Sequence, residues 1–386
     1  MTLTANWNYP TSIRVGAGRV AELPDACREL GIGTPLLVTD PGLAGLPLMR
    51  RVLETLQRTG LQTELFSAIK ANPNGDNVAA GVAAFHRAGC DGVIACGGGS
   101  ALDAAKAVAL MVGQQRPLWD FEDLGDNWTR VNEEGMAPVV ALPTTAGTGS
   151  EVGRASVITD QDDRRKKIIF HPRMLPERVI LDPELTLGLP PDLTAATGMD
   201  ALSHSLEAFC APSYHPMAEG IAVEGIRLVQ QFLPRAVADG SDLEARTQML
   251  VASAMGATAF QRGLGGMHAL AHPLGALYDA HHGTLNAILM PYVLQANRDA
   301  IGERIDHLAQ CMDLPGSGYD AFLEWVLALR ELLSIPHTLA EIGIDDSHAD
   351  RIGAMAAADP SAGGNPVDLG SDGYRSLFLR AVAGEV

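Results

Sequence analysis

Four of the eleven histidines of this sequence lie within fifteen residues: His268, His272, His281 and His282. Upstream, Asp200 and His204 are four residues apart in a segment that reads as a helix, and His268 and His272 have the same spacing. At 3.6 residues per turn, this spacing places both side chains of a pair on one helix face. A helix break is expected before His282, at Gly275 or Asp279. A carboxylate with three imidazoles suits a divalent first-row metal such as Fe²⁺ or Zn²⁺.

The alternative is that these histidines are exposed or form ordinary hydrogen bonds in a core, which is the better interpretation for any one of them taken alone. It is weaker for the whole set, because an Asp–His pair and a dense histidine run on apolar helices are costly to bury without a partner. Glu207, one turn beyond His204, points the same way and is placed to orient a ligand. The other histidines occur singly and are interpreted as ordinary residues: His86, His171, His215, His307, His337 and His348.

A glycine-rich turn, Gly97-Gly-Gly-Ser100, lies where an aliphatic run passes into an alanine-rich segment. Consecutive glycines let backbone N–H groups approach an anion, and a helix start adds unpaired donors and partial positive charge. The turn is not the G-x-G-x-x-G fingerprint, because Leu102 takes the place of its last glycine, and no Gly-Lys-Ser/Thr of a P-loop follows. The alternative is a tight strand–helix turn capped by Ser100.

A second small, polar loop, Pro143–Glu151, follows another aliphatic run and carries the hydroxyls of Thr144, Thr145, Thr148 and Ser150. Two such loops at strand ends are what a dinucleotide crossing a sheet edge requires. Asp40, at the end of an earlier run, is placed to bind an adenosine ribose and to repel a 2′-phosphate, which favours NAD over NADP. Taken alone, Asp40 is better explained as a turn former before Pro41.

The elements that carry these residues change in character along the chain. Short aliphatic runs alternate with helix-like stretches up to about residue 190, which predicts parallel strands buried on both faces: Pro35–Asp40, Asp91–Cys96, Pro138–Pro143 and Arg178–Asp182. After Pro190-Pro191 long amphipathic stretches predict helices: Leu193–Ala211, Pro216–Ala238, Leu243–Gln261 and Arg304–Met312. We therefore expect an α/β domain over residues 1–189 and a helical domain over residues 190–386.

Composition excludes several classes of partner. The chain has 28 Lys and Arg against 46 Asp and Glu, a net charge of −18, which opposes binding to nucleic-acid phosphates or anionic lipid. Its apolar runs are far shorter than the ~18 residues that cross a bilayer, and Met1–Pro10 lacks the pattern of a signal peptide. Five scattered cysteines without a Cys-x-x-Cys pair predict a reducing, cytoplasmic location.

Four stretches together resemble the iron-containing (group III) alcohol dehydrogenases, a family that includes lactaldehyde reductase, propanediol dehydrogenase and butanol dehydrogenases. They are Gly97–Ser100 with Asp103 and Lys106; Pro143–Glu151; Ala195–His204; and Gly265–Gly275 leading to His282-Gly283. The resemblance extends from Gly16 near the start to Pro366 near the end.

The resemblance implies a Rossmann-like dinucleotide-binding α/β domain and an all-α domain, as in dehydroquinate synthase, with the active site in the cleft between them. It implies that the metal ligands are Asp200, His204, His268 and His282, and that His272 relays protons near the nicotinamide. It also implies contacts with the cofactor, NAD rather than NADP, by Asp40, Asn72, Gly97, Gly98, Gly99, Ser100, Asp103, Thr144, Thr145, Thr148 and Lys166. Members of the family are commonly dimers or larger homo-oligomers.

The sequence departs from the family pattern near the substrate. Gly153 and Ala155 stand where relatives carry threonine and a larger residue, and Val367 replaces an arginine after Asn365-Pro366. The smaller side chains suggest a roomier pocket for a small alcohol or aldehyde, whose identity these residues do not specify. Arg154 and Arg262 lie close to the motifs and are placed either to attract an anionic aldehyde or, as is commoner, to face solvent.

The expected reaction is hydride transfer between a primary alcohol or aldehyde and nicotinamide, with the metal as Lewis acid and His272 in the proton path. Alternatives are a glycerol dehydrogenase-like zinc enzyme, a metal-independent maleylacetate reductase relative, and a lyase of the dehydroquinate synthase type that uses NAD catalytically. The complete ligand set argues against the metal-independent enzyme. The lyase would need phosphate-gripping basic residues, which are not evident.

Overall fold

The computed structural model describes residues 10–163, 165–316 and 318–386. The segment on which the signal-peptide interpretation rests lies almost wholly outside the described residues. The chain divides between Leu189 and Pro190 into two compact units, which are taken in turn. Among the described residues, no helix is both long enough and apolar enough to cross a membrane.

The first unit is built on a six-stranded, fully parallel sheet, as the aliphatic runs predict. The four predicted strands are present, with ends shifted by at most two residues: β2 (Pro35–Val38), β4 (Gly92–Gly97), β5 (Val139–Pro143) and β8 (Arg178–Leu181). Two further strands, β1 (Ser12–Val15) and β3 (Glu64–Phe66), form the edges of the sheet. All residues of β4 and β5 are buried, whereas the edge strands are partly exposed.

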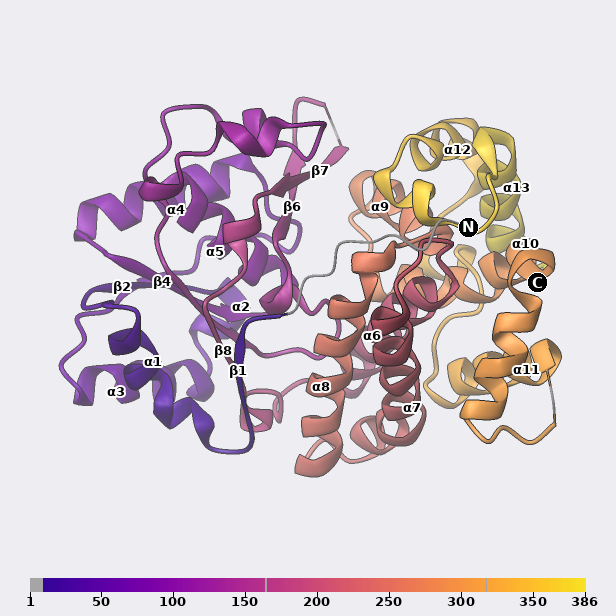
Figure 1. Ribbon diagram of the computed structural model, residues 1–386, viewed down its shortest axis with the longest axis horizontal. Helices are drawn as coiled ribbons and strands as arrows, with labels where there is room; N and C mark the ends of the chain where they lie inside the picture. Colours follow the sequence, from indigo (N-terminus) through magenta and orange to yellow (C-terminus); the bar gives the residue numbers. More distant parts are fainter. Residues whose placement is uncertain (1–9, 164, 317) are drawn as a thin grey trace. The chain divides into compact units, whose positions relative to one another are not determined.

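Helices cover both faces of this sheet (Figure 1). On one face, α1 (Leu23–Glu29) and α3 (Pro47–Arg58) pack against inward residues of β2, β4 and β5, among them Leu37, Ile94 and Val140. On the other face lie α4 (Gly75–Ala88) and α5 (Gly99–Met111), which contact each other and the central strands. Side chains alternate between faces along a strand, so a strand covered on both sides is apolar throughout.

The strand order β1-β8-β5-β4-β2-β3 creates a switch point between β2 and β4. From β2 the chain passes to β3 at one edge of the sheet. It then returns to the other side of β2, where β4, β5 and β8 are added in turn toward the opposite edge. Ligands of open α/β sheets bind at such a point, outside the carboxyl ends of the strands. Asp40 follows β2 and the turn Gly97–Ser100 begins at the end of β4, so both predicted cofactor segments lie at the switch point.

The first unit also contains elements that the sequence analysis did not predict. Strands β6 (Ala155–Asp160) and β7 (Arg165–Phe170) form a separate antiparallel pair in which Thr159 faces Lys166. The short helix α2 (Pro41–Ala44) follows Asp40, and the 3₁₀ helix η5 (Ser150–Val152) follows the threonine-rich loop.

The second unit is helical, and no strand occurs among its described residues. Its helices are α6 (Pro191–Cys210), α7 (Pro216–Ala238), α8 (Leu243–Ala259), α9 (Gly266–Tyr278), α10 (His282–Cys311), α11 (Gly318–Leu332), α12 (Ala349–Ala357) and α13 (Gly370–Ala383). The first three agree with the prediction, and the predicted helix Arg304–Met312 is the end of the much longer α10. The prediction of an α/β domain followed by a helical domain is therefore confirmed.

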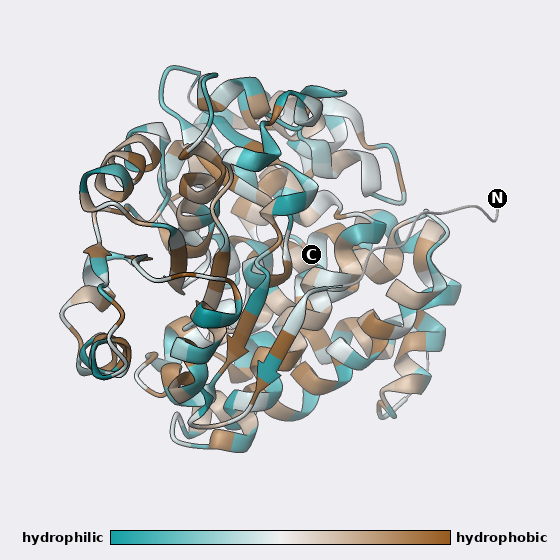
Figure 2. Cartoon of the chain, turned by 60° about the vertical axis from the view of Figure 1, so that its left-hand side comes forward, coloured by the Kyte–Doolittle hydropathy of each residue, from teal (hydrophilic) through white to brown (hydrophobic). Residues whose placement is uncertain are grey.

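Helix α6 is central to this unit and contacts α7, α8 and α10 (Figure 1). Small residues allow the close approach: a Cβ atom on Gly198 would lie 2.2 Å from Leu233 of α7. Other helices change between hydrophilic and hydrophobic residues along their length (Figure 2), as expected when one face is buried. In α6, by contrast, every residue from Thr194 to Cys210 is buried, including Asp200, His204 and Glu207. Buried polar groups require partners, so α6 must carry a polar site.

Candidate active site: a metal centre and two cofactor loops

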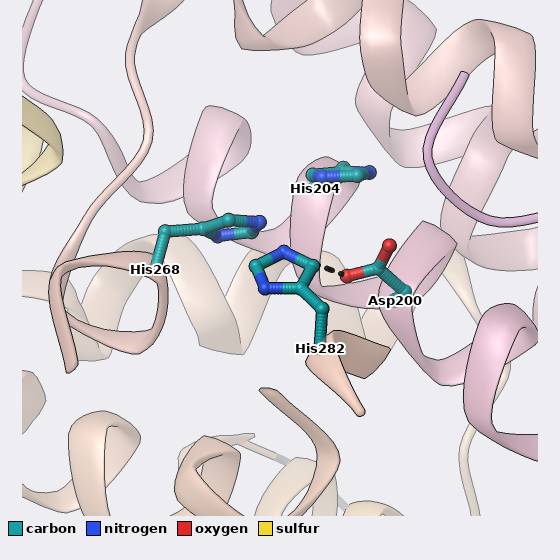
Figure 3. A group of neighbouring side chains, drawn as sticks. All are labelled: Asp200, His204, His268 and His282. Carbon is teal, nitrogen blue, oxygen red and sulfur yellow. Dashed lines mark ion pairs between the residues drawn. The ribbon is translucent and has the colours of Figure 1, made fainter. Parts of the chain in front are cut away.

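The four predicted metal ligands converge in the helical unit (Figure 3). Asp200 and His204 lie one turn apart on α6, His268 is on α9, and His282 is the first residue of α10. One potential ligand atom from each side chain lies within 4.8 Å of those of the others. The first three residues are buried and His282 is half-buried, so the group is most accessible to solvent at His282.

Local backbone features bring these helices together. Helix α9 ends at Tyr278, and Asp279 adopts a left-handed conformation with φ of 53°, which is the predicted break. A Cβ atom on Gly283 would lie only 2.3 Å from the carbonyl oxygen of Ala196, so glycine is required where α10 starts against α6. His282 is thereby held with its Nε2 3.7 Å from Asp200 Oδ1.

Glu207 orients His268, as its position one turn beyond His204 predicts. Its Oε2 lies 2.7 Å from His268 Nδ1 and accepts from the backbone N–H of Gly265 at 2.8 Å, while Oε1 accepts from that of Met267 at 2.6 Å. The carboxylate therefore holds the start of α9 and the ring that α9 carries. Burial lowers the pKa of His268, but the carboxylates of Glu207, Asp200 and Asp359 together outweigh burial and leave that pKa raised. With the proton on Nδ1, the Nε2 lone pair of His268 is directed to the other ligand atoms.

The donor set fits a divalent metal. One carboxylate oxygen and three imidazole nitrogens meet in a largely buried site, and the orientation of His268 is fixed by a carboxylate, as in many metal centres. Such nitrogen and oxygen ligands suit Fe²⁺ and Zn²⁺.

His272 lies beside this group but is bound elsewhere. Its ring stacks on that of His282, with centroids 5.6 Å apart, and its Nδ1 lies 2.9 Å from Asp359 Oδ2. Burial raises the pKa of Asp359, yet His272 and the hydrogen bonds from Ser361 together outweigh burial and leave that pKa lowered. His281, the remaining histidine of the cluster, is exposed and caps α10. These observations separate His272 from the four converging residues.

In the α/β unit, the two predicted cofactor loops face each other. A Cβ atom on Gly99 would lie 2.4 Å from Thr148 Cγ2, and one on Gly98 would lie 3.4 Å from Thr145. The backbone N–H of Thr144 donates to the Gly97 carbonyl at 2.9 Å. The close approach of the threonine loop therefore requires glycine at position 99 and leaves little room for a side chain at position 98.

The glycine-rich turn presents backbone donors. Gly98 is the residue before α5, and no side chain caps this helix end. Ser100 is inside the helix, where its hydroxyl donates to the carbonyl of Ala71, so the interpretation of Ser100 as a cap is wrong. Uncapped N–H groups at the start of a long helix form an anion-binding site of the kind used for pyrophosphate.

Asp40 lies at the same edge. Its Oδ1 caps α2 by accepting from Leu43 N–H at 3.0 Å, and its Oδ2 would lie 3.6 Å from a Cβ atom on Gly97. The turn-forming role and a ribose-binding role are thus compatible, because they use different oxygens. Asn72 lies next to Ala71, and Lys166 pairs with Thr159, whose N–H donates to Pro73 at 2.7 Å.

Asp103, on α5, links this helix to the threonine-rich loop and to β6. Its carboxylate accepts from the Ser150 hydroxyl and, at 2.9 Å, from the Val157 N–H. Lys106 is 1% exposed and lies 3.4 Å from Asp103; its Nζ donates to the carbonyls of Ser150, at 2.9 Å, and Ala155. Sequence reasoning grouped Asp103 with the cofactor contacts. Its hydrogen bonds support the loop that carries the threonines.

Two polar residues near the metal ligands were missed in the sequence analysis. Asp359 follows α12, far from any motif, and nothing in the sequence connects it with His272. Asn286 lies four residues after His282, so its helix spacing could have indicated that it faces the ligands. Arg262, considered there as an exposed or substrate-binding residue, is 6% exposed and paired with Glu219.

Comparison with known proteins decides the family. The model of the iron-containing alcohol dehydrogenases matches residues 10–183, and that of the C-terminal domain of the same family matches residues 194–382. The chain belongs to the iron-containing alcohol dehydrogenase family. Like other iron-containing alcohol dehydrogenases, it is a metal-dependent, NAD-linked alcohol dehydrogenase and aldehyde reductase that acts on small alcohols or aldehydes.

Individual relatives extend over almost the whole chain. A 4-hydroxybutyrate dehydrogenase of Cupriavidus necator is 40% identical over 97% of this chain and 99% of its own length. An NAD-dependent methanol dehydrogenase of Bacillus methanolicus is 34% identical over 94% and 95%. The crystal structure of a 1,3-propanediol oxidoreductase superposes with a TM-score of 0.92 at 33% identity, covering 98% of this chain and all of that one.

Proposed function

We propose that residues 1–189 form the NAD-binding domain and residues 190–386 the metal-binding, catalytic domain of this alcohol dehydrogenase. The NAD pyrophosphate binds the uncapped start of α5 at Gly97–Ser100, and Asp40 binds the adenosine ribose. Thr144, Thr145 and Thr148 contact the cofactor from the opposite loop, with Asn72 and Lys166 beside them. The position of these segments at the β2/β4 switch point supports this assignment.

Asp200, His204, His268 and His282 hold the metal, which is Fe²⁺ or Zn²⁺. The convergence of these four side chains carries the proposal. When bound, the metal supplies a Lewis acid that polarises the substrate oxygen, and NAD supplies or accepts the hydride. With neutral imidazoles the ligand set has a formal charge of −1, so part of the charge of a divalent ion stays uncompensated. Glu207 keeps the His268 lone pair directed inward.

His272 carries the proton between the substrate and water. Asp359 accepts from its Nδ1 and so leaves Nε2 as the nitrogen that exchanges a proton. In this arrangement the four ligands need not change protonation during the reaction, because a separate histidine does.

The substrates are small primary alcohols and their aldehydes. The most informative set to test comes from the relatives: 4-hydroxybutyrate, methanol and 1,3-propanediol. We infer that Gly153 and Ala155 enlarge the pocket. A Cβ atom on Gly153 would meet only ordinary contacts, 3.5 Å from the Ser150 carbonyl and 3.6 Å from Lys106 Nζ, so the backbone there does not demand glycine. If the small side chain of Ala155 makes room for the substrate, an Ala155→Phe variant should lose activity on the longest aldehydes first.

We further propose a cytoplasmic homo-oligomer, a dimer or larger. All five cysteines are free thiols, four of them buried, which suits a reducing compartment. Light scattering on the purified protein tests the oligomer.

One assay tests the proposed function. NADH absorbance is followed with a panel of aldehydes, on the purified enzyme, after chelation, and after Fe²⁺ or Zn²⁺ is restored. We expect activity that disappears on chelation and returns with metal, and that is lost when Asp200 or His268 is replaced by alanine. Full turnover in those variants would refute the proposed metal site, and no turnover with any aldehyde would refute the proposed substrates.

A further inference from the structure

Asn286 lies at the point where the metal ligands converge. It is on α10, one turn after His282, and its side chain is fully buried. Its Nδ2 lies 2.8 Å from Asp200 Oδ1, 3.2 Å from His268 Nε2 and 3.2 Å from His282 Nε2. One amide group is therefore within hydrogen-bonding distance of three of the four potential ligand atoms.

These contacts cannot all be satisfied by the amide. An asparagine Nδ2 carries two hydrogens, whereas three acceptor atoms surround it. His268 Nε2 has a lone pair to offer, because its Nδ1 is held by Glu207. The carboxylate at 2.8 Å is the closest acceptor and the one that carries charge, so it takes the strongest of these bonds.

Asp200 depends on this amide for a hydrogen bond. Within the described residues, the only donor to its carboxylate is Asn286, apart from the longer ion pair with His282. Glu207, the other carboxylate of α6 near the site, has three hydrogen-bond partners. Asp200 is 2% exposed, so bulk solvent has little access to its carboxylate. A single amide thus fixes the direction in which the Asp200 oxygen points.

The other end of the amide is also informative. Asn286 Oδ1 is buried and accepts no hydrogen bond within the described part of the chain. A buried amide with an unsatisfied oxygen is unfavourable as a packing element, so packing does not explain an asparagine here. Its placement is explained if the N–H group is needed by the ligands.

We propose that Asn286 is a positioning residue of the metal centre. Its Nδ2–H bond to Asp200 holds the carboxylate in the orientation that binds the cation, and the neutral amide adds no second negative charge. When the metal is present, the imidazole lone pairs of His268 and His282 turn to it, and the bond to Asp200 remains. This inference rests on the proposed metal site. Groups that orient ligands in this way typically contribute about 10- to 100-fold to metal affinity.

The test compares the metal affinity of the parent enzyme with that of two variants. Asn286→Leu keeps the branched shape of the side chain and removes the donor, and Asn286→Ala leaves space for a water molecule. Affinity for Zn²⁺ and Co²⁺ is measured by competition with a chromophoric chelator, and the visible spectrum of the Co²⁺ enzyme reports the ligand geometry. We expect at least about tenfold weaker binding and an altered spectrum for Asn286→Leu, with a smaller loss for Asn286→Ala.

Asn297 provides a matched control. It is another buried amide on α10, and it is paired with Asn365 at 2.8 and 2.9 Å rather than with a metal ligand. Asn297→Leu should lower the melting temperature as Asn286→Leu does, yet leave the Co²⁺ spectrum unchanged. If Asn286→Leu does not fold, Asn286→Ala decides the question.

The remaining outcomes would overturn either the positioning role of Asn286 or the proposed metal site. Parent affinity and a parent Co²⁺ spectrum in a folded Asn286 variant would overturn the inference while leaving the metal site intact. A five-coordinate Co²⁺ spectrum in the parent that becomes four-coordinate in the variants would make Asn286 a ligand and equally overturn the positioning role. If the parent binds no metal, or if Asp200→Ala binds it normally, the proposed function itself fails.

Discussion

The metal centre depends on side chains, whereas the cofactor loops depend on the backbone. In the metal centre, four side chains from three helices supply every ligand, and the backbone only brings them together. In the loops, small residues let two backbone segments approach closely and leave the N–H groups at the start of α5 uncapped, and little depends on a long side chain. The first site should fail when atoms are removed, and the second should fail when atoms are added. The two sites also lie in separate compact units, so each failure should leave the other site intact.

The largest effect is expected from removing a metal ligand. His268→Ala deletes both a ligand atom and the partner of Glu207, leaving a buried carboxylate without one of its three partners. Loss of a Lewis acid worth several kcal/mol corresponds to at least about 10³-fold in kcat/KM. Metal content measured by atomic absorption should fall in parallel, whereas the Kd for NADH, from its fluorescence, should be unchanged. Weakened NADH binding would contradict the independence of the two sites.

The converse experiment adds one methyl group to the cofactor loops. Gly99→Ala places a Cβ atom about 2.4 Å from Thr148 Cγ2, which forces the two loops apart. We expect NADH binding to weaken by about 10- to 100-fold, equivalent to about 1.4–2.7 kcal/mol, with unchanged metal content.

A double variant shows whether the clash is the cause. Thr148→Ala removes the two nearest atoms, although the Thr148 Cβ at 3.0 Å remains. Thr148→Ala combined with Gly99→Ala should therefore bind NADH more tightly than Gly99→Ala alone. If the double variant is no better, the loss has another origin, such as a disturbed start of α5.

The two regions were also predictable to different extents. The sheet and the metal ligands follow from local patterns: aliphatic runs define β2, β4, β5 and β8, and helix spacing defines the Asp200–His204 and His268–His272 pairs. The combination of the two pairs with His282 came from resemblance to the family, because spacing alone does not say which helices meet. The cofactor loops were recognised as small and polar, but their mutual contact depends on the sheet order.

What the sequence did not indicate depends on long-range packing. Asp359 meets His272 across 87 residues, and neither residue type nor spacing links them. Asn286 is close in sequence to His282, yet an asparagine inside a long helix has many ordinary explanations. The pair β6 and β7 was missed because β7 begins Arg165-Lys-Lys167, which masks its alternation of buried and half-buried residues. Such contacts become visible only when the helices and strands are assembled.

A smaller effect should follow from changing Asp359, which acts on the metal region without supplying a ligand. Asp359→Ala removes the acceptor for His272 Nδ1, so the ring loses its fixed orientation. Because general acid–base catalysis contributes about 10²–10⁴-fold, loss of orientation alone should lower kcat by about tenfold. The solvent isotope effect on kcat should rise as proton transfer becomes slower.

Metal content should stay at the parent level, and partial rescue by Asp359→Glu would support a positioning role. A parent-like kcat would remove His272 from the proton path or Asp359 from its support.

The smallest effect on catalysis is expected at a buried carboxyl beside the cofactor loops, where a substitution should change the stability of the fold instead. Glu151 is 1% exposed, one of its oxygens accepts no hydrogen bond among the described residues, and burial raises its pKa from 4.5 to about 7 despite the nearby Lys106. A carboxyl whose pKa is higher in the folded state stabilises the fold fully below its unfolded pKa, and that contribution is lost as pH rises from about 4.5 through 7. Glutamine mimics the protonated acid, so Glu151→Gln should match the parent in stability at about pH 4, below the unfolded pKa, and exceed it at about pH 8. At about 1.4 kcal/mol per pKa unit, the gain is at most about 3 kcal/mol, and less if the loop relaxes when the acid ionises. Chemical denaturation at the two pH values measures this gain in stability.

A variant that is less stable than the parent at pH 8 would show that the ionised carboxylate is held by Lys106. This loop would then resemble the metal centre in depending on a charged side chain.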